Sequence, residues 1–98
     1  MSLGGLSPTK PATPEVQAIS SQVKQQLEDR VGEIYTIFWA IAYRSQVVAG
    51  TNYFIKIQIG PDRYAHLRVF LRLPAEGGQA ELTSYQLGHT RTDPITYF

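Results

Sequence analysis

Apolar side chains recur at helical spacing in the first third of the chain. One face of the helix that they predict carries Val16, Ile19, Val23 and Leu27. Thr13 can cap the free N–H groups, Pro14 suits the first helical position, and Gly32 is a typical stop. We therefore predict one amphipathic helix over residues 14–31, whose apolar stripe needs a partner surface.

After Gly32 the pattern changes to the alternation that is typical of strands. Four segments rich in β-branched and aromatic residues follow, at 34–48, 53–59, 64–73 and 80–87. Their connections are short, so consecutive strands should pair antiparallel. One face of this sheet must cover the helix, which gives an α+β two-layer domain. The alternation places a second set of residues on the opposite face: Phe54, Lys56, Gln58, His66, Arg68 and Arg72.

The length of 98 residues indicates a single domain, which begins with an N-terminal arm. Residues 1–12 contain two glycines and two prolines, a composition that indicates an extended, mobile segment. The whole chain, residues 1–98, is therefore expected to fold as a single unit with its N-terminal 12 residues outside the core.

Charge and cysteine content exclude several functions. The formal net charge is +1 and the basic residues are scattered, so nucleic acid and acidic membranes are not expected partners. The chain has no cysteine, which excludes disulfides, a thiolate nucleophile and cysteine-type zinc sites. No segment has the length of a membrane span or the character of a signal peptide, which indicates a cytoplasmic protein, with the nucleus as an alternative.

Candidate chemistry is sparse. His66 lies within a predicted strand and His89 near a loop, and neither has acidic neighbours at metal-ligand spacing. We interpret both as solvated or hydrogen-bonded side chains. No nucleophile motif, phosphate loop or dinucleotide fingerprint occurs, so we expect no enzyme, no cofactor and no metal.

Three apolar tips remain to be explained. They are the arm residues Leu3, Gly4 and Gly5, the hairpin residues Gln46, Val47, Val48, Ala49 and Gly50, and the loop residues Leu73 and Pro74. Each alone could be a mobile end, a strand residue near a turn, or a strand exit. In an antiparallel meander, however, alternate connections lie at the same end of the sheet. An apolar patch formed there would indicate a binding site.

These segments give the chain a family resemblance. It resembles the stefins, the type 1 cystatins, in GGLS at 4–7, PATPE at 11–15, SQVVAGTNYFIK at 45–56, HLRVF at 66–70 and the LP pair at 73–74. The resemblance implies the cystatin fold, in which an antiparallel sheet of four to five strands wraps around one long helix. It also implies reversible, tight-binding inhibition of papain-like cysteine proteases such as cathepsins.

The resemblance further implies how such inhibition works. The arm and the two loops form a wedge that fills the protease cleft, with Gly4 near the catalytic cysteine and Leu3 in a non-primed subsite. Val47, Val48, Leu73 and Pro74 would lie on the primed side. The resemblance also implies that a monomer can convert to a domain-swapped dimer through the hairpin.

Four apolar residues depart from the stefin pattern. Ile37, Trp39, Ala42 and Leu71 stand where stefins usually carry polar residues. Local repacking accounts for them, and the alternative is a new apolar surface, natural or engineered, that promotes self-association. The second functional hypothesis is therefore a cystatin-fold assembly or binding module whose inhibition is altered or lost.

Overall fold

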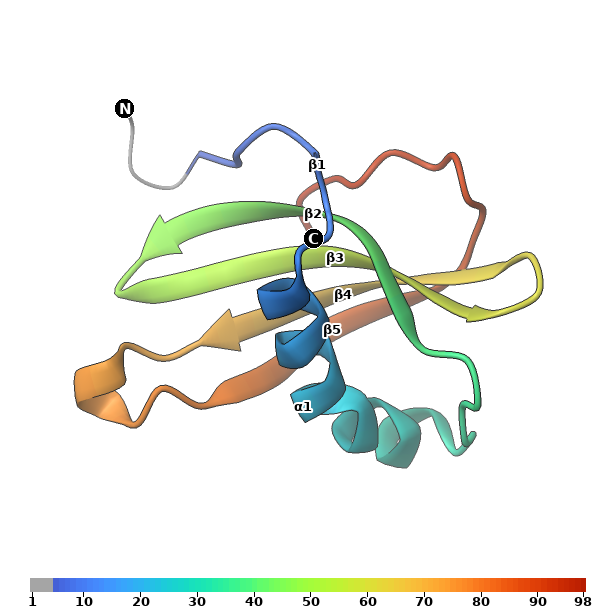
Figure 1. The fold of residues 1–98 in the computed structure, drawn as a ribbon, viewed down its shortest axis with the longest axis horizontal. Coiled ribbons are helices and arrows are strands. Elements are labelled where there is room, and N and C mark those ends of the chain that lie inside the picture. Colours follow the sequence, from blue (N-terminus) through green and yellow to red (C-terminus); the bar gives the residue numbers. More distant parts are fainter. Residues whose placement is uncertain (1–4) are drawn as a thin grey trace.

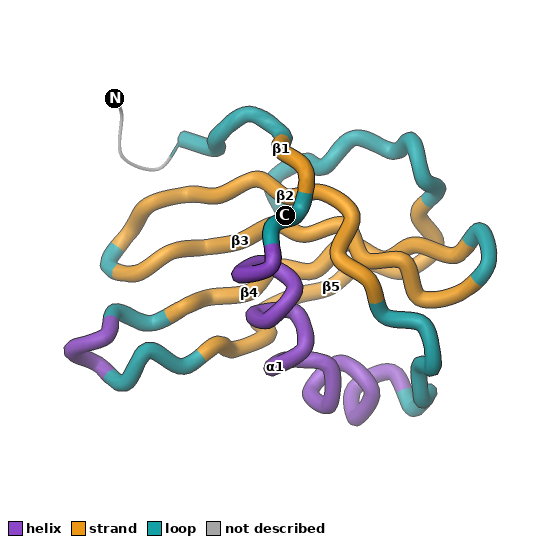
Figure 2. Tube along the Cα trace, viewed as in Figure 1, coloured by secondary structure: helices purple, strands orange, loops and turns teal. Residues whose placement is uncertain are grey.

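One helix lies across one face of a five-stranded antiparallel sheet (Figure 1). The structure is a computed structural model that describes residues 5–98. The elements in chain order are β1 (Lys10–Pro11), α1 (Pro14–Val31), β2 (Trp39–Val48), β3 (Gly50–Gly60), β4 (Arg63–Leu71), a short 3-10 helix (Pro74–Glu76) and β5 (Ala80–His89). The strands are ordered β1-β2-β3-β4-β5, and each pairs antiparallel with the next. The expected α+β architecture is confirmed (Figure 2).

Helix α1 begins and ends where its local signals predict. The Thr13 hydroxyl accepts a hydrogen bond from the Val16 N–H at 3.2 Å. At the other end Gly32 has φ 79°, and its N–H donates to the Glu28 carbonyl at 2.8 Å. No helix among residues 5–98 combines the length and apolar character that a membrane span requires.

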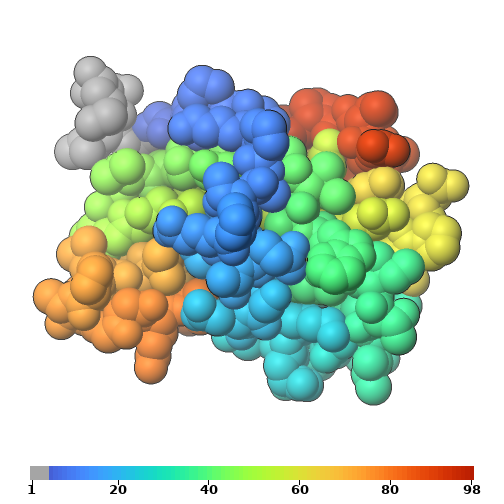
Figure 3. Space-filling view, in the orientation of Figure 1, coloured from blue at the N-terminus to red at the C-terminus, as the bar shows by residue number. Residues whose placement is uncertain are grey.

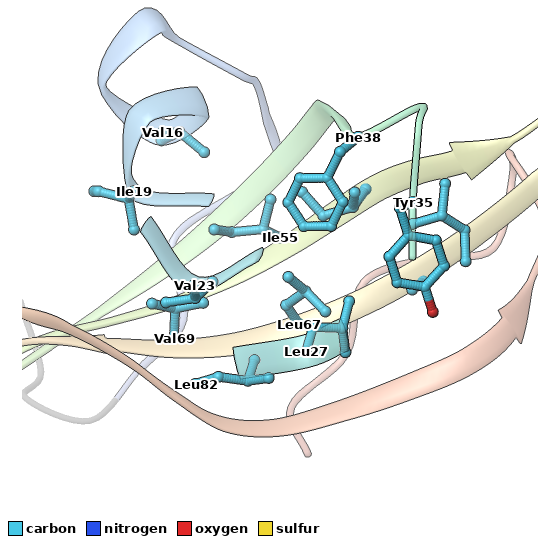
Figure 4. Packing of buried hydrophobic residues seen from close by; sticks show 13 residues of the cluster. Val16, Ile19, Val23, Leu27, Tyr35, Phe38, Ile55, Leu67, Val69 and Leu82 are labelled. Carbon is cyan, nitrogen blue, oxygen red and sulfur yellow. The ribbon is translucent and has the colours of Figure 1, made fainter. Parts of the chain in front are cut away.

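The hydrophobic core lies between α1 and the inner face of the sheet (Figure 4). The predicted stripe of α1 supplies Val16, Ile19, Val23 and Leu27, all 3% exposed or less. The sheet supplies Ile55, Ile57, Ile59, Ala65, Leu67, Val69 and Leu82. Burying a side chain of this size contributes about 1.5–3 kcal/mol, so this interface accounts for much of the fold's stability.

The first predicted strand begins later than expected. Residues 32–38 form an irregular connection, and β2 begins at Trp39. The Tyr35 N–H donates to the Glu28 carboxylate at 2.8 Å, and the Tyr35 and Phe38 rings both turn into the core. These inward contacts break the strand alternation, and they leave Ile34 83% exposed. The third predicted strand is also shorter, because β4 ends at Leu71 rather than Leu73.

The outer face of the sheet is covered by the C-terminal segment, which the sequence pattern did not indicate. Ile95 is buried, and the rings of Tyr97 and Phe98 lie 5.4 and 5.7 Å from the ring of Phe54. Phe54 and His66 are fully buried and Lys56 is 7% exposed. The sheet is therefore enclosed on both sides, with α1 on one and residues 90–98 on the other.

The N-terminal arm runs along β2 from residue 7 onward. The Ser7 N–H donates to the Ser45 carbonyl at 2.8 Å, and the Ser45 N–H donates to the Ser7 hydroxyl at 2.9 Å. Lys10 then pairs with Tyr43 in β1. Because β1 and β2 are antiparallel, residues 5 and 6 lie on the side of Ser7 toward the β2–β3 hairpin. Leu3 and Gly4 lie outside the described residues.

Candidate functional site

The β2–β3 hairpin presents two exposed valines at its tip. Val48 is paired with Gly50, and Ala49 forms the connection between the strands. Val47 is 52% exposed and Val48 is 40% exposed, although valine favours buried strand positions. The expectation that these side chains face solvent rather than the core is confirmed.

Gln46 is buried, unlike the three residues that follow it. It is 8% exposed, and its side-chain oxygen accepts a hydrogen bond from the Asn52 amide at 2.9 Å. Gln46 and Asn52 also face each other in the strand register. Their side-chain bond joins the two strands two residues below the tip. Gln46 therefore supports the tip, and its side chain is not part of the exposed surface.

Gly50 brings the hairpin close to β4. Its φ of 121° is a backbone conformation that side chains rarely allow. A Cβ atom built there would lie 2.6 Å from the Leu71 carbonyl oxygen and 2.7 Å from Cζ of the Phe70 ring. Only glycine permits this contact, through which the hairpin rests against the end of β4.

The loop between β4 and β5 is held by its own backbone. The Leu73 carbonyl accepts hydrogen bonds from the N–H groups of Glu76 at 2.8 Å and Gly78 at 3.0 Å. Pro74 begins the 3-10 helix within the loop, and the Arg72 N–H donates to the Gln79 carbonyl at 2.9 Å. Leu73 is 43% exposed. The loop therefore presents an apolar side chain on an ordered backbone.

The two loops lie side by side at one end of the sheet. Thr51 pairs with Leu71, so the hairpin tip and the β4–β5 loop project from adjacent positions. Figure 1 shows both at the same end, with the β3–β4 turn at the opposite end, as the meander predicted. In Figure 3 the hairpin, in light green, and the β4–β5 loop, in orange, lie next to each other at this end. We call residues 46–50 and 73–74 the apolar edge.

A histidine cluster lies on the outer face of the sheet. The rings of His66 and His89 are stacked with centroids 3.7 Å apart. His89 lies 2.8 Å from the Asp93 carboxylate and 2.8 Å from the Gln86 side-chain oxygen, so its interpretation as a hydrogen-bonded residue is confirmed. The interpretation of His66 is wrong, because within residues 5–98 neither ring nitrogen has a hydrogen-bond partner.

Electrostatics explain why His66 stays neutral. Burial, followed by the neighbouring His89 and Lys56, lowers the pKa of His66 to about 4. Hydrogen bonds from the Thr90 side chain and backbone lower the pKa of Asp93. No group of three or more His, Cys, Asp and Glu side chains among residues 5–98 could hold a metal ion. This cluster lies several residues along the strands from the apolar edge, since His66 pairs with Lys56 whereas Leu71 pairs with Thr51.

The four departures from the stefin pattern do not share one environment. Leu71 packs against the core cluster, and Ile37 and Ala42 are half-buried. Trp39 alone is strongly exposed, at 58%. For Leu71, the structure supports local repacking rather than a new surface.

The site therefore consists of two braced loops that present exposed apolar side chains at one end of a helix-backed sheet. The comparison with known families identifies the class of protein that has this fold. The cystatin domain model matches residues 4–92, and the chain belongs to the cystatin family, in its stefin branch.

Individual relatives match over nearly their full lengths. Cystatin-A of Felis catus is 50% identical over 95 residues, which cover 97% of each chain. Stefin-C of Bos taurus is 51% identical over 98% of this chain and 95% of its own. Leukocyte cysteine proteinase inhibitor 1 of Sus scrofa is 49% identical over 100% of this chain and 95% of its own.

Proposed function

We propose that this protein is a reversible inhibitor of papain-like cysteine proteases that inserts its apolar edge into the active-site cleft. The proposal rests on one observation: exposed valines on one loop and an exposed leucine on the other lie on adjacent loops at the same end of the sheet. A relative of similar sequence is named as a cysteine proteinase inhibitor, which supports the same function.

The physical properties of the apolar edge suit a protease cleft. Such a cleft is an apolar groove shaped for extended backbone. Val47, Val48 and Leu73 offer apolar area that is exposed before binding, so desolvating them favours the complex. The Gln46–Asn52 bond and the contacts of Gly50 hold the tip in place, so little conformational entropy is lost on docking.

The arm is proposed as the third part of the contact. Gly5 is exposed, and the register of β1 directs residues 5–9 toward the hairpin. By family resemblance Gly4 would approach the catalytic cysteine, and Leu3 would occupy a subsite next to it. The inhibitor supplies no reacting group and needs no cofactor. We also propose a cytoplasmic location, where proteases released from other compartments would be its targets.

Replacing Val48 with aspartate tests the proposal. A carboxylate at this position would be buried against the cleft without a partner, which costs several kcal/mol. We expect inhibition of papain to weaken by at least roughly 100-fold, while the thermal transition stays within a few degrees of the wild type because Val48 is exposed. The inhibition constant and the melting temperature are measured on the same samples.

Leu87→Asp is the matched control for Val48→Asp. Leu87 is 43% exposed in β5 and lines a shallow pocket beside Asp62 and Arg63, away from the apolar edge. Leu87→Asp also replaces an exposed apolar side chain with a carboxylate, as Val48→Asp does. It should leave the inhibition of papain intact. Equal losses in both variants would remove the apolar edge from the mechanism. A wild-type protein that does not inhibit papain would favour the alternative function of an assembly or binding module.

A further inference from the structure

The side chain of Arg44 connects the N-terminal arm to the C-terminal segment. Arg44 lies in β2 opposite Phe54, on the outer face of the sheet. Its Nε donates to the Ser7 carbonyl at 2.9 Å, and its Nη1 donates to the Ile95 carbonyl at 2.7 Å. Because the guanidinium is planar, these two donors point in fixed relative directions. One side chain therefore sets the position of the arm relative to the C-terminal segment.

The described part of the arm has few other bonds to the sheet. Strand β1 is only two residues long, and the prolines at positions 8 and 11 have no N–H to donate. Nearer the hairpin, the Ser7 N–H donates to the Ser45 carbonyl at 2.8 Å, and the Ser7 hydroxyl accepts from the Ser45 N–H at 2.9 Å. Arg44 binds the remaining polar group of Ser7, its carbonyl. The placement of the arm beside the hairpin therefore depends on Ser7 and on the groups that hold it.

The C-terminal segment is the firmly held partner of Arg44. Ile95 is 2% exposed, and the two aromatic rings that end the chain pack against Phe54. The Phe98 carbonyl accepts from Nη1 of Arg68 at 2.9 Å. This segment is thus fixed on the sheet by burial and by a second arginine. A guanidinium already held by a buried segment has less freedom to lose when it also binds the arm.

We propose that Arg44 is a positioning residue, which transfers the fixed placement of the C-terminal segment to the arm and so holds the arm beside the β2–β3 hairpin. Its consequence for inhibition rests on the proposed function. An arm that is already held next to the hairpin has less conformational entropy to lose when both dock on a protease. Removing the guanidinium should free the arm, while the hairpin tip stays braced by Gln46 and Gly50.

Arg44→Met tests whether the guanidinium holds the arm, with Arg30→Met as its control. Methionine keeps an unbranched apolar stem and removes both donors, and Arg30 is an exposed residue in the last turn of α1. We expect the Ser45 amide, which donates to Ser7, to exchange with solvent about tenfold faster in Arg44→Met and at an unchanged rate in Arg30→Met. The Ile55 amide in β3 reports unfolding of the whole protein, and NMR measures both rates on one sample. Unchanged Ser45 exchange, or an equal rise at Ile55, overturns the proposal.

The inhibition constant against papain shows whether Arg44 acts through the arm. Arg44→Met should weaken inhibition about tenfold in the full-length protein, and by less than about twofold once residues 1–5 are deleted, because the arm then contributes nothing. Equal weakening in both backgrounds would give Arg44 a different role and overturn the proposal. A wild-type protein that does not inhibit papain overturns the proposed function and this use of the arm, whereas the exchange rates decide the coupling by themselves.

Ile95→Ala tests the C-terminal segment as the anchor. This change removes a buried side chain and loosens the segment, but it leaves the carbonyl that Arg44 binds. Relative to the Ile55 amide, Ser45 exchange should rise about threefold in Ile95→Ala, and adding Ile95→Ala to Arg44→Met should have no further effect. Additive effects in the double variant would show that the two residues act independently, which overturns the coupling.

Discussion

Gly50 shows how one residue can serve both the fold and the site. Its backbone conformation and the closeness of Phe70 and Leu71 leave no room for a side chain. The same contact fixes the hairpin tip relative to the neighbouring loop. Sequence alone identified Gly50 as part of a turn, but the ring against which it packs belongs to a strand twenty residues later.

We predict that Gly50→Ala destabilises the fold and weakens inhibition together. The unfavourable φ alone costs about 1–3 kcal/mol, and the contact with Leu71 and Phe70 adds to that cost because β4 must move. Urea unfolding and the inhibition constant against papain measure the two effects.

Gly77→Ala separates the backbone cost from the steric cost. Gly77 has φ 107°, close to that of Gly50, but a Cβ there meets nothing within 4 Å. Gly77→Ala should therefore lose only the backbone cost, about 1–3 kcal/mol. If the two variants are equally stable and equally inhibitory, close packing of Gly50 is not what positions the tip.

At the scale of elements, the sequence predicted correctly those helices and strands whose ends are set by neighbouring residues in the chain. Helix α1 follows from its cap, its stripe and its glycine stop, all within about twenty residues. Residues 34–38 were wrongly assigned to a strand, because their aromatic side chains satisfy a strand pattern but pack into the core against α1 and β3. A tertiary contact of this kind leaves no local signal in the pattern.

The β2–β3 hairpin is also the element through which we predict domain swapping. Val47 and Val48 favour extended backbone, and only Ala49 separates the paired residues Val48 and Gly50. If the tip straightens, β1, α1 and β2 can complete the sheet of a second chain with all contacts remade except those of the tip. The resulting dimer should not inhibit papain, because the tip no longer exists.

Incubation just below the melting temperature should produce this dimer slowly, since the sheet must open first. Size-exclusion chromatography separates the species, and each is assayed against papain. A heat-formed dimer that inhibits as well per chain as the monomer would contradict the swapped arrangement. So would a dimer that forms equally fast at 25 °C.

At the scale of the whole molecule, the main feature that the sequence did not predict is the C-terminal segment, residues 90–98, which covers the outer face of the sheet. The alternation placed Lys56 and His66 on the face away from the helix, which is correct, but burial of that face depends on residues 90–98 folding back over it. The Lys56 ammonium donates to the Arg91 carbonyl at 2.6 Å, and burial lowers its pKa. The apolar edge was predictable because its two loops are alternate connections of a meander and so lie at the same end of the sheet. The support from Asn52 and Phe70 was not predictable.

We predict that His66 makes the fold sensitive to acid. Its pKa is about 4 in the folded protein against an ordinary value of 6.5, so the unfolded chain binds a proton more readily between these values. The contribution to stability is fully present above pH 6.5 and is lost as the pH falls toward 4. On lowering the pH from 7.5 to 4.5 the loss is roughly 2 to 3 kcal/mol.

His66→Phe should remove this loss, because phenylalanine keeps a ring against His89 and does not titrate. Urea unfolding at pH 7.5 and 4.5 compares the two proteins. Lys56, His89 and Asp93 are present in both proteins, so the difference between the two pH dependences reports the titration of His66 together with its coupling to these groups. A pH dependence of the variant that matches the wild type would show that His66 is not the source.

The separation of the apolar edge from the core has a consequence for engineering. Val47, Val48 and Leu73 are exposed, and none belongs to the core cluster. Their identities can therefore be randomised in a display library without selecting against folding, provided that Gln46, Gly50 and the residues supporting them stay fixed. Variants recovered against different targets would share one scaffold, and their affinities would report the chemistry of the tip alone.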